Sequence, residues 1–368
     1  MIDRLSLALW RLLPAVAARG SRWLGGILAD GRYLTAWPRA AAGVPLLALA
    51  SGLGCGIIQP GMPLGGSIFA SSLYVLIPAL TLGAVSAHAG FVFAAGFGAA
   101  DLVFGHHLHE YLPWWNNFII MLGYLISYAV MATLCAAVPA SAQWLRSYVA
   151  LPRCSADARV LLDAAWTAAL AAALTYLALA AAPMLIRPAF VWYDGIPVIS
   201  AVYWLQHGAW LWSLMVAVLT AVRVLFEYAA AHRDPAWTLH DPVSDRPSLL
   251  ERASAPVAVT LRAALATAYF AGLLQTYSQA LLLFGGLLLI GRWELALTGK
   301  GRRPPWIERI PPLVRLSLVL ATAILPFYIA APQLLGELSF TIFLLLLLGS
   351  AFVAATLFPR RHPAGGHP

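Results

Sequence analysis

The chain has 368 residues, of which 61% are hydrophobic and only 10% are charged. A soluble domain carries roughly 25% charged residues, so this composition excludes an ordinary soluble globule, and it excludes a disordered or collagen-like chain as well. The net charge of +8 does not indicate a nucleic-acid partner, because the basic residues lie in short segments beside long apolar runs. We therefore expect an all-α, polytopic α-helical membrane protein.

Residues 1–39 are predicted to form an amphipathic helix at the membrane surface. Arg4, Arg11 and Arg22 fall on one side of a helical wheel. Apolar residues fall on the other side, namely Leu5, Leu9, Leu12, Leu13 and Val16. Such a segment inserts its apolar side and attracts anionic lipid, so we expect an anchor at the anionic inner leaflet. A docking helix for a partner subunit is the alternative.

Ten apolar runs follow that are long enough to cross the membrane, which takes about 20 residues for ~30 Å of hydrocarbon. These runs are 40–59, 67–86, 89–105, 117–139, 160–183, 200–226, 255–274, 279–297, 313–331 and 339–358. Because the backbone finds no water partner in lipid, each run is predicted to be a helix. Residues 40–358 are thus expected to form one transmembrane domain, and 359–368 a cytoplasmic tail.

The basic residues set the predicted orientation. With ten spans and a cytoplasmic N-terminus, every one of the 23 Lys and Arg residues except Arg187 and Arg262 falls on the cytoplasmic side. The stretches 67–105 and 255–297 could each be one broken helix, but merging 67–105 would move the basic loop near Arg146 outside. We therefore expect ten spans with both termini in the cytoplasm. Five spans per half also permit an inverted 5+5 arrangement, which is common among secondary transporters.

The first span contains Gly52, Gly54 and Gly56, which indicate either close helix packing or a break in the helix. Its counterpart in a 5+5 scheme is the sixth span, which contains Gln206 and His207. Paired interruptions in equivalent helices would point to a substrate site near the middle of the membrane.

Asp101, in the third span, is a candidate for the substrate path, because ionisable residues inside spans are costly and often functional. Arg262, in the seventh span, is a second candidate, and Asp163 matches it in depth, so the two could also form a structural ion pair. Gln275 and Gln279 extend the candidate path.

The external loop after the third span contains His106, His109 and Glu110, which would share one face of a helix and could bind a metal ion. An interfacial loop anchored by neighbouring tryptophans is the simpler interpretation. A cluster that responds to external pH is a further alternative, because histidine titrates near neutrality.

Known intramembrane enzymes need residues that this sequence does not supply. The rhomboid-type Gly-x-Ser-Gly is absent, and the candidate loop after the first span, 60–66, has no acidic residue. Enzymatic activity is therefore the less favoured hypothesis, and no cofactor is identified.

Two functions remain open. The first is a permease or secondary transporter of unknown substrate. The second is a non-catalytic scaffold, anchor or assembly subunit that binds other membrane or cytoplasmic subunits. The expected location in either case is an integral membrane position, with the bacterial inner membrane preferred over an organelle.

Overall fold

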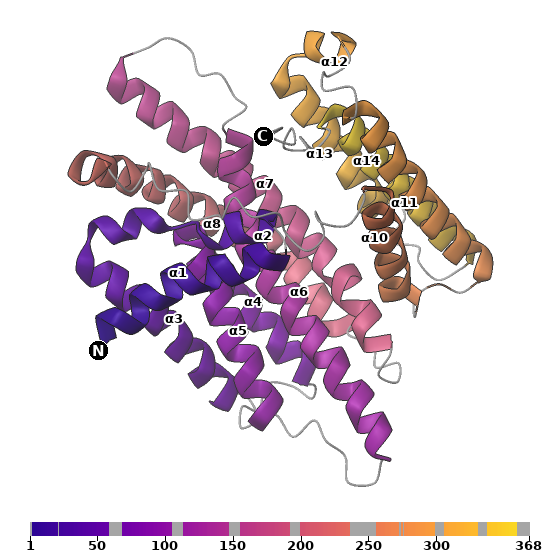
Figure 1. The fold of residues 1–368 in the computed structure, drawn as a ribbon, viewed down its shortest axis with the longest axis horizontal. Helices are drawn as coiled ribbons and strands as arrows, with labels where there is room; N and C mark the ends of the chain where they lie inside the picture. Colours follow the sequence, from indigo (N-terminus) through magenta and orange to yellow (C-terminus); the bar gives the residue numbers. More distant parts are fainter. Residues whose placement is uncertain are drawn as a thin grey trace, which may run out of the picture. The chain divides into compact units, whose positions relative to one another are not determined.

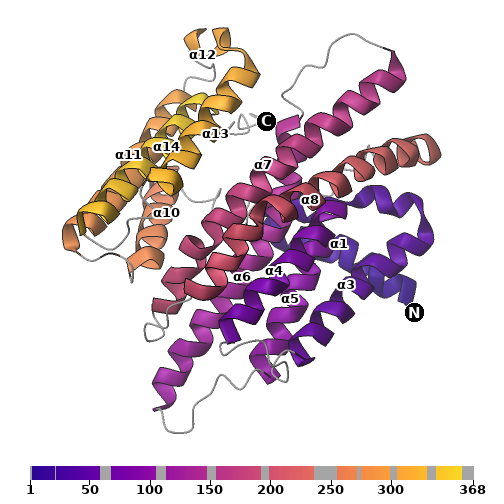
Figure 2. The same cartoon turned by 180° about the vertical axis from the view of Figure 1, so that it is seen from behind.

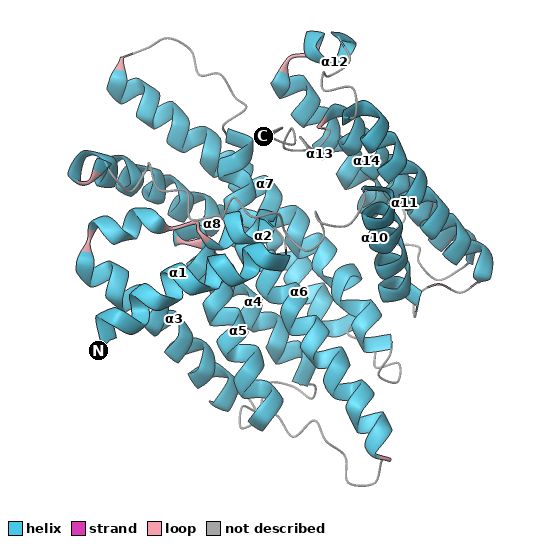
Figure 3. Cartoon of the chain, in the orientation of Figure 1, coloured by secondary structure: helices cyan, strands magenta, loops and turns pink. Residues whose placement is uncertain are grey.

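The computed structural model describes residues 2–20, 22–58, 68–104, 113–146, 155–191, 199–235, 255–271, 274, 276–298, 305–329 and 337–358. Helices make up nearly all of these residues, with short loops between them and no strand (Figure 3). The prediction of an all-helical chain is therefore confirmed for the described residues.

The chain divides into two compact units, Met1–Leu250 (unit 1) and Glu251–Pro368 (unit 2). Unit 1 contains α1 (Ile2–Gly20), α2 (Arg22–Leu28), the 3-10 helix η1 (Arg32–Ala36), α3 (Pro38–Ile58), α4 (Ile68–Val85), α5 (Ala87–Phe104), α6 (Trp114–Arg146), α7 (Ala156–Val191) and α8 (Ile199–Arg233) (Figures 1 and 2). Unit 2 contains α10 (Ala255–Phe270), α11 (Tyr277–Thr298), α12 (Pro305–Arg309), α13 (Pro312–Ile329) and α14 (Glu337–Leu357).

Six segments in the described part of the chain are long and apolar enough to cross a membrane, as expected of a membrane protein. They are Pro38–Ile58, Ala87–Phe104, Ala156–Ala180, Gly208–Arg233, Tyr277–Leu297 and Phe340–Leu357. Shorter apolar helices cover Leu76–Val85, Pro256–Phe270 and Val314–Ala323. The count of ten spans and the 5+5 arrangement stay predictions.

Three helices of unit 1 are much longer than their predicted spans. α6, α7 and α8 have 33, 36 and 35 residues. At 1.5 Å per residue each is roughly 50 Å long, which exceeds the ~30 Å of hydrocarbon. The apolar runs marked only part of each helix, because the polar residues beyond the run continue the same helix.

The stretch 67–105 forms two helices and not one broken helix. Only Ser86 separates α4 from α5, and its hydroxyl accepts a hydrogen bond from Ala89 N at 3.3 Å, which caps the start of α5. The helices then fold back on each other, since a Cβ added at Gly90 would lie 2.7 Å from the carbonyl oxygen of Ala79. In a continuous helix these residues would be roughly 16 Å apart.

α5 lies at the centre of unit 1, where it packs against α3, α4 and α6. α3 is continuous through its glycines and uses two of them to approach α5. A Cβ added at Gly52 would lie 2.2 Å from the carbonyl oxygen of Phe93, and one at Gly56 would lie 2.7 Å from that of Phe97. A Cβ at Gly54 would meet nothing within 4 Å. Gly52 and Gly56 are therefore packing positions, and Gly54 faces away from α5.

The N-terminal segment is packed into unit 1. The indole of Trp10 donates a hydrogen bond to the carbonyl oxygen of Ala41 at 2.9 Å, and it clusters with Tyr33 and Ala230. Leu12 and Val16, on the side that was predicted to insert into the membrane, are 62% and 57% exposed at the surface of the protein. α1 therefore has two apolar faces, of which one packs on the protein and the other remains exposed.

Hydrogen bonds between polar side chains, and from one hydroxyl to a backbone carbonyl, join the helices of unit 2. The amide of Gln279 on α11 donates to the hydroxyl of Thr341 on α14 at 3.0 Å, and the indole of Trp293 donates to that of Thr356 at 3.0 Å. The hydroxyl of Ser350 on α14 donates to the carbonyl oxygen of Thr322 on α13 at 2.5 Å. These bonds fix α14 against α11 and α13.

Candidate functional site

The site begins where the N-terminal segment meets the start of α5. The carboxylate of Asp30 accepts a hydrogen bond from Ala87 N at 2.9 Å, and the backbone carbonyl of Asp30 accepts one from the Ser86 hydroxyl at 3.2 Å. A carboxylate in this position satisfies a free amide and interacts favourably with the positive end of the helix dipole. Asp30 therefore ties the segment before α3 to α5.

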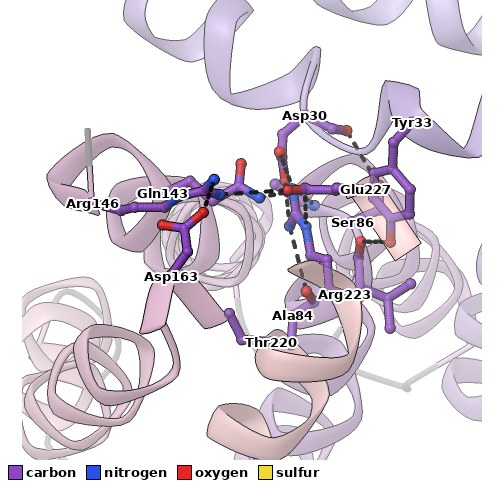
Figure 4. A network of polar contacts seen from close by, with 12 residues as sticks. Asp30, Tyr33, Ala84, Ser86, Gln143, Arg146, Asp163, Thr220, Arg223 and Glu227 are labelled. Atoms are coloured by element: carbon purple, nitrogen blue, oxygen red, sulfur yellow. Dashed lines mark hydrogen bonds and ion pairs between the residues drawn. The ribbon is translucent and has the colours of Figure 1, made fainter. Parts of the chain in front are cut away.

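Arg223 of α8 is the centre of the site (Figure 4). Its side chain is 1% exposed. Its Nη1 donates to Asp30 Oδ2 at 3.0 Å and to the carbonyl oxygen of Ala84 at 3.4 Å, its Nη2 donates to Asp30 Oδ1, and its Nε donates to Glu227 Oε1 at 2.8 Å. All three nitrogens thus have acceptors, as a buried guanidinium requires.

The contacts continue from α8 to α6 and α7. Glu227 Oε1 also accepts a hydrogen bond from Gln143 Nε2 at 2.5 Å, and Glu227 Oε2 lies 3.7 Å from Arg146 Nη1. Arg146 in turn forms an ion pair with Asp163 at the start of α7. Acidic and basic groups alternate along this path, so each guanidinium lies between two carboxylates.

Tyr33 also contacts Arg223. Its ring lies under the guanidinium of Arg223, at 5.4 Å, and its hydroxyl donates to the carbonyl oxygen of Val85 at 2.6 Å. Burial raises the pKa of Tyr33 above its ordinary value, although the nearby Arg223 acts in the opposite direction. The phenol therefore stays neutral. We call this set the charge network: Asp30, Tyr33, Gln143, Arg146, Asp163, Arg223 and Glu227.

A buried histidine adjoins the network. His88 Nδ1 lies 3.0 Å from the carbonyl oxygen of Leu28, and its ring stacks on Trp10 at 4.3 Å. Because a carbonyl only accepts hydrogen bonds, Nδ1 carries the hydrogen. His88 therefore joins α1, α2 and α5 beside the point where Asp30 caps α5.

A second polar position lies near the other end of α5. Asp101 is buried, and the hydroxyl of Tyr128 on α6 donates a hydrogen bond to its Oδ2. Gly98 permits this approach, because a Cβ there would lie 2.7 Å from Tyr128 Cβ. At 1.5 Å per residue, Asp101 lies roughly 21 Å along α5 from Ala87. The Asp101–Tyr128 pair and the charge network therefore occupy opposite ends of one central helix.

Sequence reasoning found part of this arrangement. It selected Asp101 and Asp163, but it did not select Arg146 as the partner of Asp163. Arg262, the partner it proposed, is exposed on α10 of unit 2, and its pairing with Asp163 stays a prediction. It missed the centre of the network, although Arg223 and Glu227 are opposite charges four residues apart at the end of an apolar run, which is a recognisable signal.

The other candidates fall in different places. Gln279 is buried in unit 2, where it bonds Thr341. Gln206 and His207 belong to α8, but their side chains lie outside the described residues, as do several candidates in full: Gln275, His106, His109 and Glu110. The metal site predicted in the external loop therefore stays a prediction. Among the described residues, no group of three or more His, Cys, Asp or Glu side chains is arranged to hold a metal ion.

No protein-family model, no curated protein and no solved structure matches the chain.

Proposed function

We propose that the chain is a permease or secondary transporter of the bacterial inner membrane, with ten spans, both termini in the cytoplasm and the charge network on the cytoplasmic side. The observation that carries the proposal is the pair of polar positions at the two ends of α5. Buried ionisable groups in a span are costly, and they commonly mark the path of a substrate or a proton. A helix with one such position near each surface suits a protein that opens alternately to the two sides.

In this proposal the charge network is the closed cytoplasmic gate. It joins the N-terminal segment to α6, α7 and α8, so the cytoplasmic ends of these helices cannot separate without breaking ion pairs. Gates of this kind close through contacts that have two discrete arrangements.

The charge balance of the network supplies a means of opening. Its ion pairs join three carboxylates and two guanidiniums, which leaves one negative charge in excess. The carboxylate of Glu227 accepts hydrogen bonds from Arg223 and Gln143 and forms an ion pair with Arg146. Loss of the Glu227 charge, as in Glu227→Gln, would remove the group that attracts both arginines, and the pairs would weaken together.

The direct test is solute uptake by proteoliposomes of the full chain, with a panel of solutes and an imposed pH gradient. The wild type is expected to accumulate at least one solute with a dependence on the gradient. Asp101→Asn should abolish that dependence, because an amide cannot exchange the proton. The matched control is Asp157→Asn, at an exposed position at the start of α7, which should transport normally. Full gradient-driven uptake by Asp101→Asn would exclude a coupling role for Asp101.

A non-catalytic scaffold, anchor or assembly subunit is the second candidate. The observation that favours it is the complete pairing of Arg223 within the protein, together with the packed N-terminal segment, since both features also serve a rigid structure. Purification from the native membrane separates the two functions. A scaffold should be recovered with partners in fixed ratio, whereas a transporter should be recovered alone or as copies of itself.

A further inference from the structure

Unit 2 contains a buried arginine whose environment differs from that of Arg223. Arg315 lies in the first turn of α13 and is 5% exposed. Its guanidinium lies over the ring of Phe358, at 5.7 Å. Among the described residues, its Nε and Nη1 have no hydrogen-bond partner. A buried cation with unpaired donors is costly, so a ligand that accepts from these nitrogens would bind favourably.

The position of Arg315 favours an anion. Arg315 lies in the first turn of α13, and the Cα–Cβ bonds of a helix tilt toward its N-terminus. The first amides of a helix lack intrahelical acceptors and carry the positive end of the dipole, which makes this end favourable for anions. The amide of Arg315 itself is already bonded to the carbonyl oxygen of Pro311 at 3.1 Å, so the guanidinium supplies the free donors.

The segment just before α13 is suited to a membrane surface. α12 presents Trp306, which is 49% exposed, and Arg309 is exposed on the same short helix. Exposed tryptophan and arginine are typical of the headgroup region of a bilayer. In the sequence, Lys300, Arg302 and Arg303 precede this helix, and such basic clusters attract anionic lipid.

We propose that Arg315 binds the phosphate group of an anionic phospholipid at the start of α13. Nε and Nη1 point to different sides of the guanidinium, so each would donate one charge-assisted hydrogen bond to a separate oxygen of the lipid headgroup, one of them a phosphate oxygen. The ring of Phe358 forms one wall of the site and interacts favourably with the cation. Free inorganic phosphate offers the same oxygen atoms, so the test includes both sources.

The experiment uses the purified full chain in detergent after removal of bound lipid. Binding is measured by native mass spectrometry and by the shift in melting temperature, with phosphatidylglycerol, phosphatidylcholine or inorganic phosphate added. The wild type should bind phosphatidylglycerol in preference to phosphatidylcholine. Arg315→Gln should bind it about tenfold more weakly or worse, because both charge-assisted hydrogen bonds are lost. The matched control is Arg292→Gln, an exposed arginine on α11 of the same unit, for which the affinity should change by about twofold or less.

The remaining outcomes are decisive as well. A response to phosphatidylglycerol alone would support a lipid site, and a response to inorganic phosphate as well would support a site for the phosphate group itself. Equal phosphatidylglycerol affinity in the wild type and Arg315→Gln, or no binding by the wild type, would overturn the proposal. Arg315→Lys guards against misfolding of the glutamine variant, because it keeps the charge and loses the fixed guanidinium donors. It should fold and bind with intermediate affinity.

Discussion

Each of the two units buries an arginine, and the two arginines differ in their hydrogen-bond partners. In unit 1, Arg223 directs Nε, Nη1 and Nη2 to the carboxylates of Asp30 and Glu227. In unit 2, Arg315 has an aromatic ring beside it and two nitrogens with no bond to any described residue. A buried cation that is fully paired holds elements of the fold together, whereas one with open donors is suited to a ligand.

The close approaches of glycines also differ between the two units. In unit 1 a glycine approaches backbone, and in unit 2 a glycine approaches a side chain. Gly52 of unit 1 approaches the backbone of α5, so an added Cβ would lie 2.2 Å from the Phe93 carbonyl oxygen. Gly286 of unit 2 approaches the end of a leucine side chain, with Leu348 Cδ1 at 2.6 Å from the added Cβ. A side-chain end can move where a backbone cannot. Unit 1 is therefore the more constrained of the two.

The largest expected effect is that of Arg223→Gln. This change leaves Asp30 and Glu227 close together without their cation, and breaking a buried pair in this way costs about 3–5 kcal/mol. The free energy of unfolding in detergent should fall by that amount. The matched control is Arg233→Gln, an exposed arginine at the end of the same helix, which should change stability by less than about 0.5 kcal/mol. Equal losses in the two variants would contradict the central role of Arg223.

Glycine substitutions give the next largest effect. Gly52→Ala should destabilise the protein by about 1–3 kcal/mol, because α3 and α5 must separate to admit the methyl group. Gly286→Ala should cost less than about 1 kcal/mol, because Leu348 can change its conformation. Gly54→Ala serves as the matched control on α3 and should be neutral or slightly stabilising, since alanine favours the helix. The melting temperatures of the three variants check this order. A larger loss for Gly286→Ala than for Gly52→Ala would contradict the difference between the two units.

Arg315→Gln sharpens the contrast with Arg223→Gln. In lipid-free detergent it should lose less than about 1 kcal/mol of stability, since no described acidic partner is left unpaired. Addition of phosphatidylglycerol should then stabilise the wild type more than the variant. A loss in lipid-free detergent as large as that of Arg223→Gln would show that Arg315 serves the fold and not a ligand.

The last prediction concerns the hydroxyl of Tyr33. Tyr33→Phe keeps the ring under Arg223 and removes the hydroxyl that donates a hydrogen bond to Val85, which costs about 1 kcal/mol. Because burial raises the pKa of Tyr33, its contribution is complete below the unfolded pKa of roughly 10 and is lost as the pH rises above that value. The melting temperature, measured from pH 8 to 11, should therefore fall less steeply with rising pH in the variant than in the wild type. Identical slopes would contradict the burial of a neutral phenol.

The sequence predicts the helical membrane class because that class depends on composition and on the length of apolar runs. It also separates α4 from α5, through the position of the basic residues near Arg146. It does not predict the charge network, because Asp30, Arg146 and Arg223 lie far apart in the chain and meet only when the helices pack. It also does not predict that Trp10 finds its hydrogen-bond acceptor on α3 and packs one face of α1 on the protein.

Asp101 can be selected from the sequence, but its hydrogen-bond partner cannot. Its position inside an apolar run marks it as unusual from the sequence alone. Its partner, Tyr128, is one of several polar residues on α6, and the pairing depends on Gly98 leaving room for the ring. Single unusual residues can be predicted from a sequence, whereas their partners require the packing.

The central claim is that the charge network opens and closes, and a distance measurement between spin labels tests it without knowledge of the substrate. Labels would be placed at the exposed positions Arg39 and Ala156, at the starts of α3 and α7, in a variant that lacks the three native cysteines. In lipid nanodiscs the wild type should show two distance populations, and Glu227→Gln should enlarge the longer one, while Asp157→Asn should leave both unchanged. A single narrow population, identical in all three proteins, would contradict the account and favour a rigid scaffold.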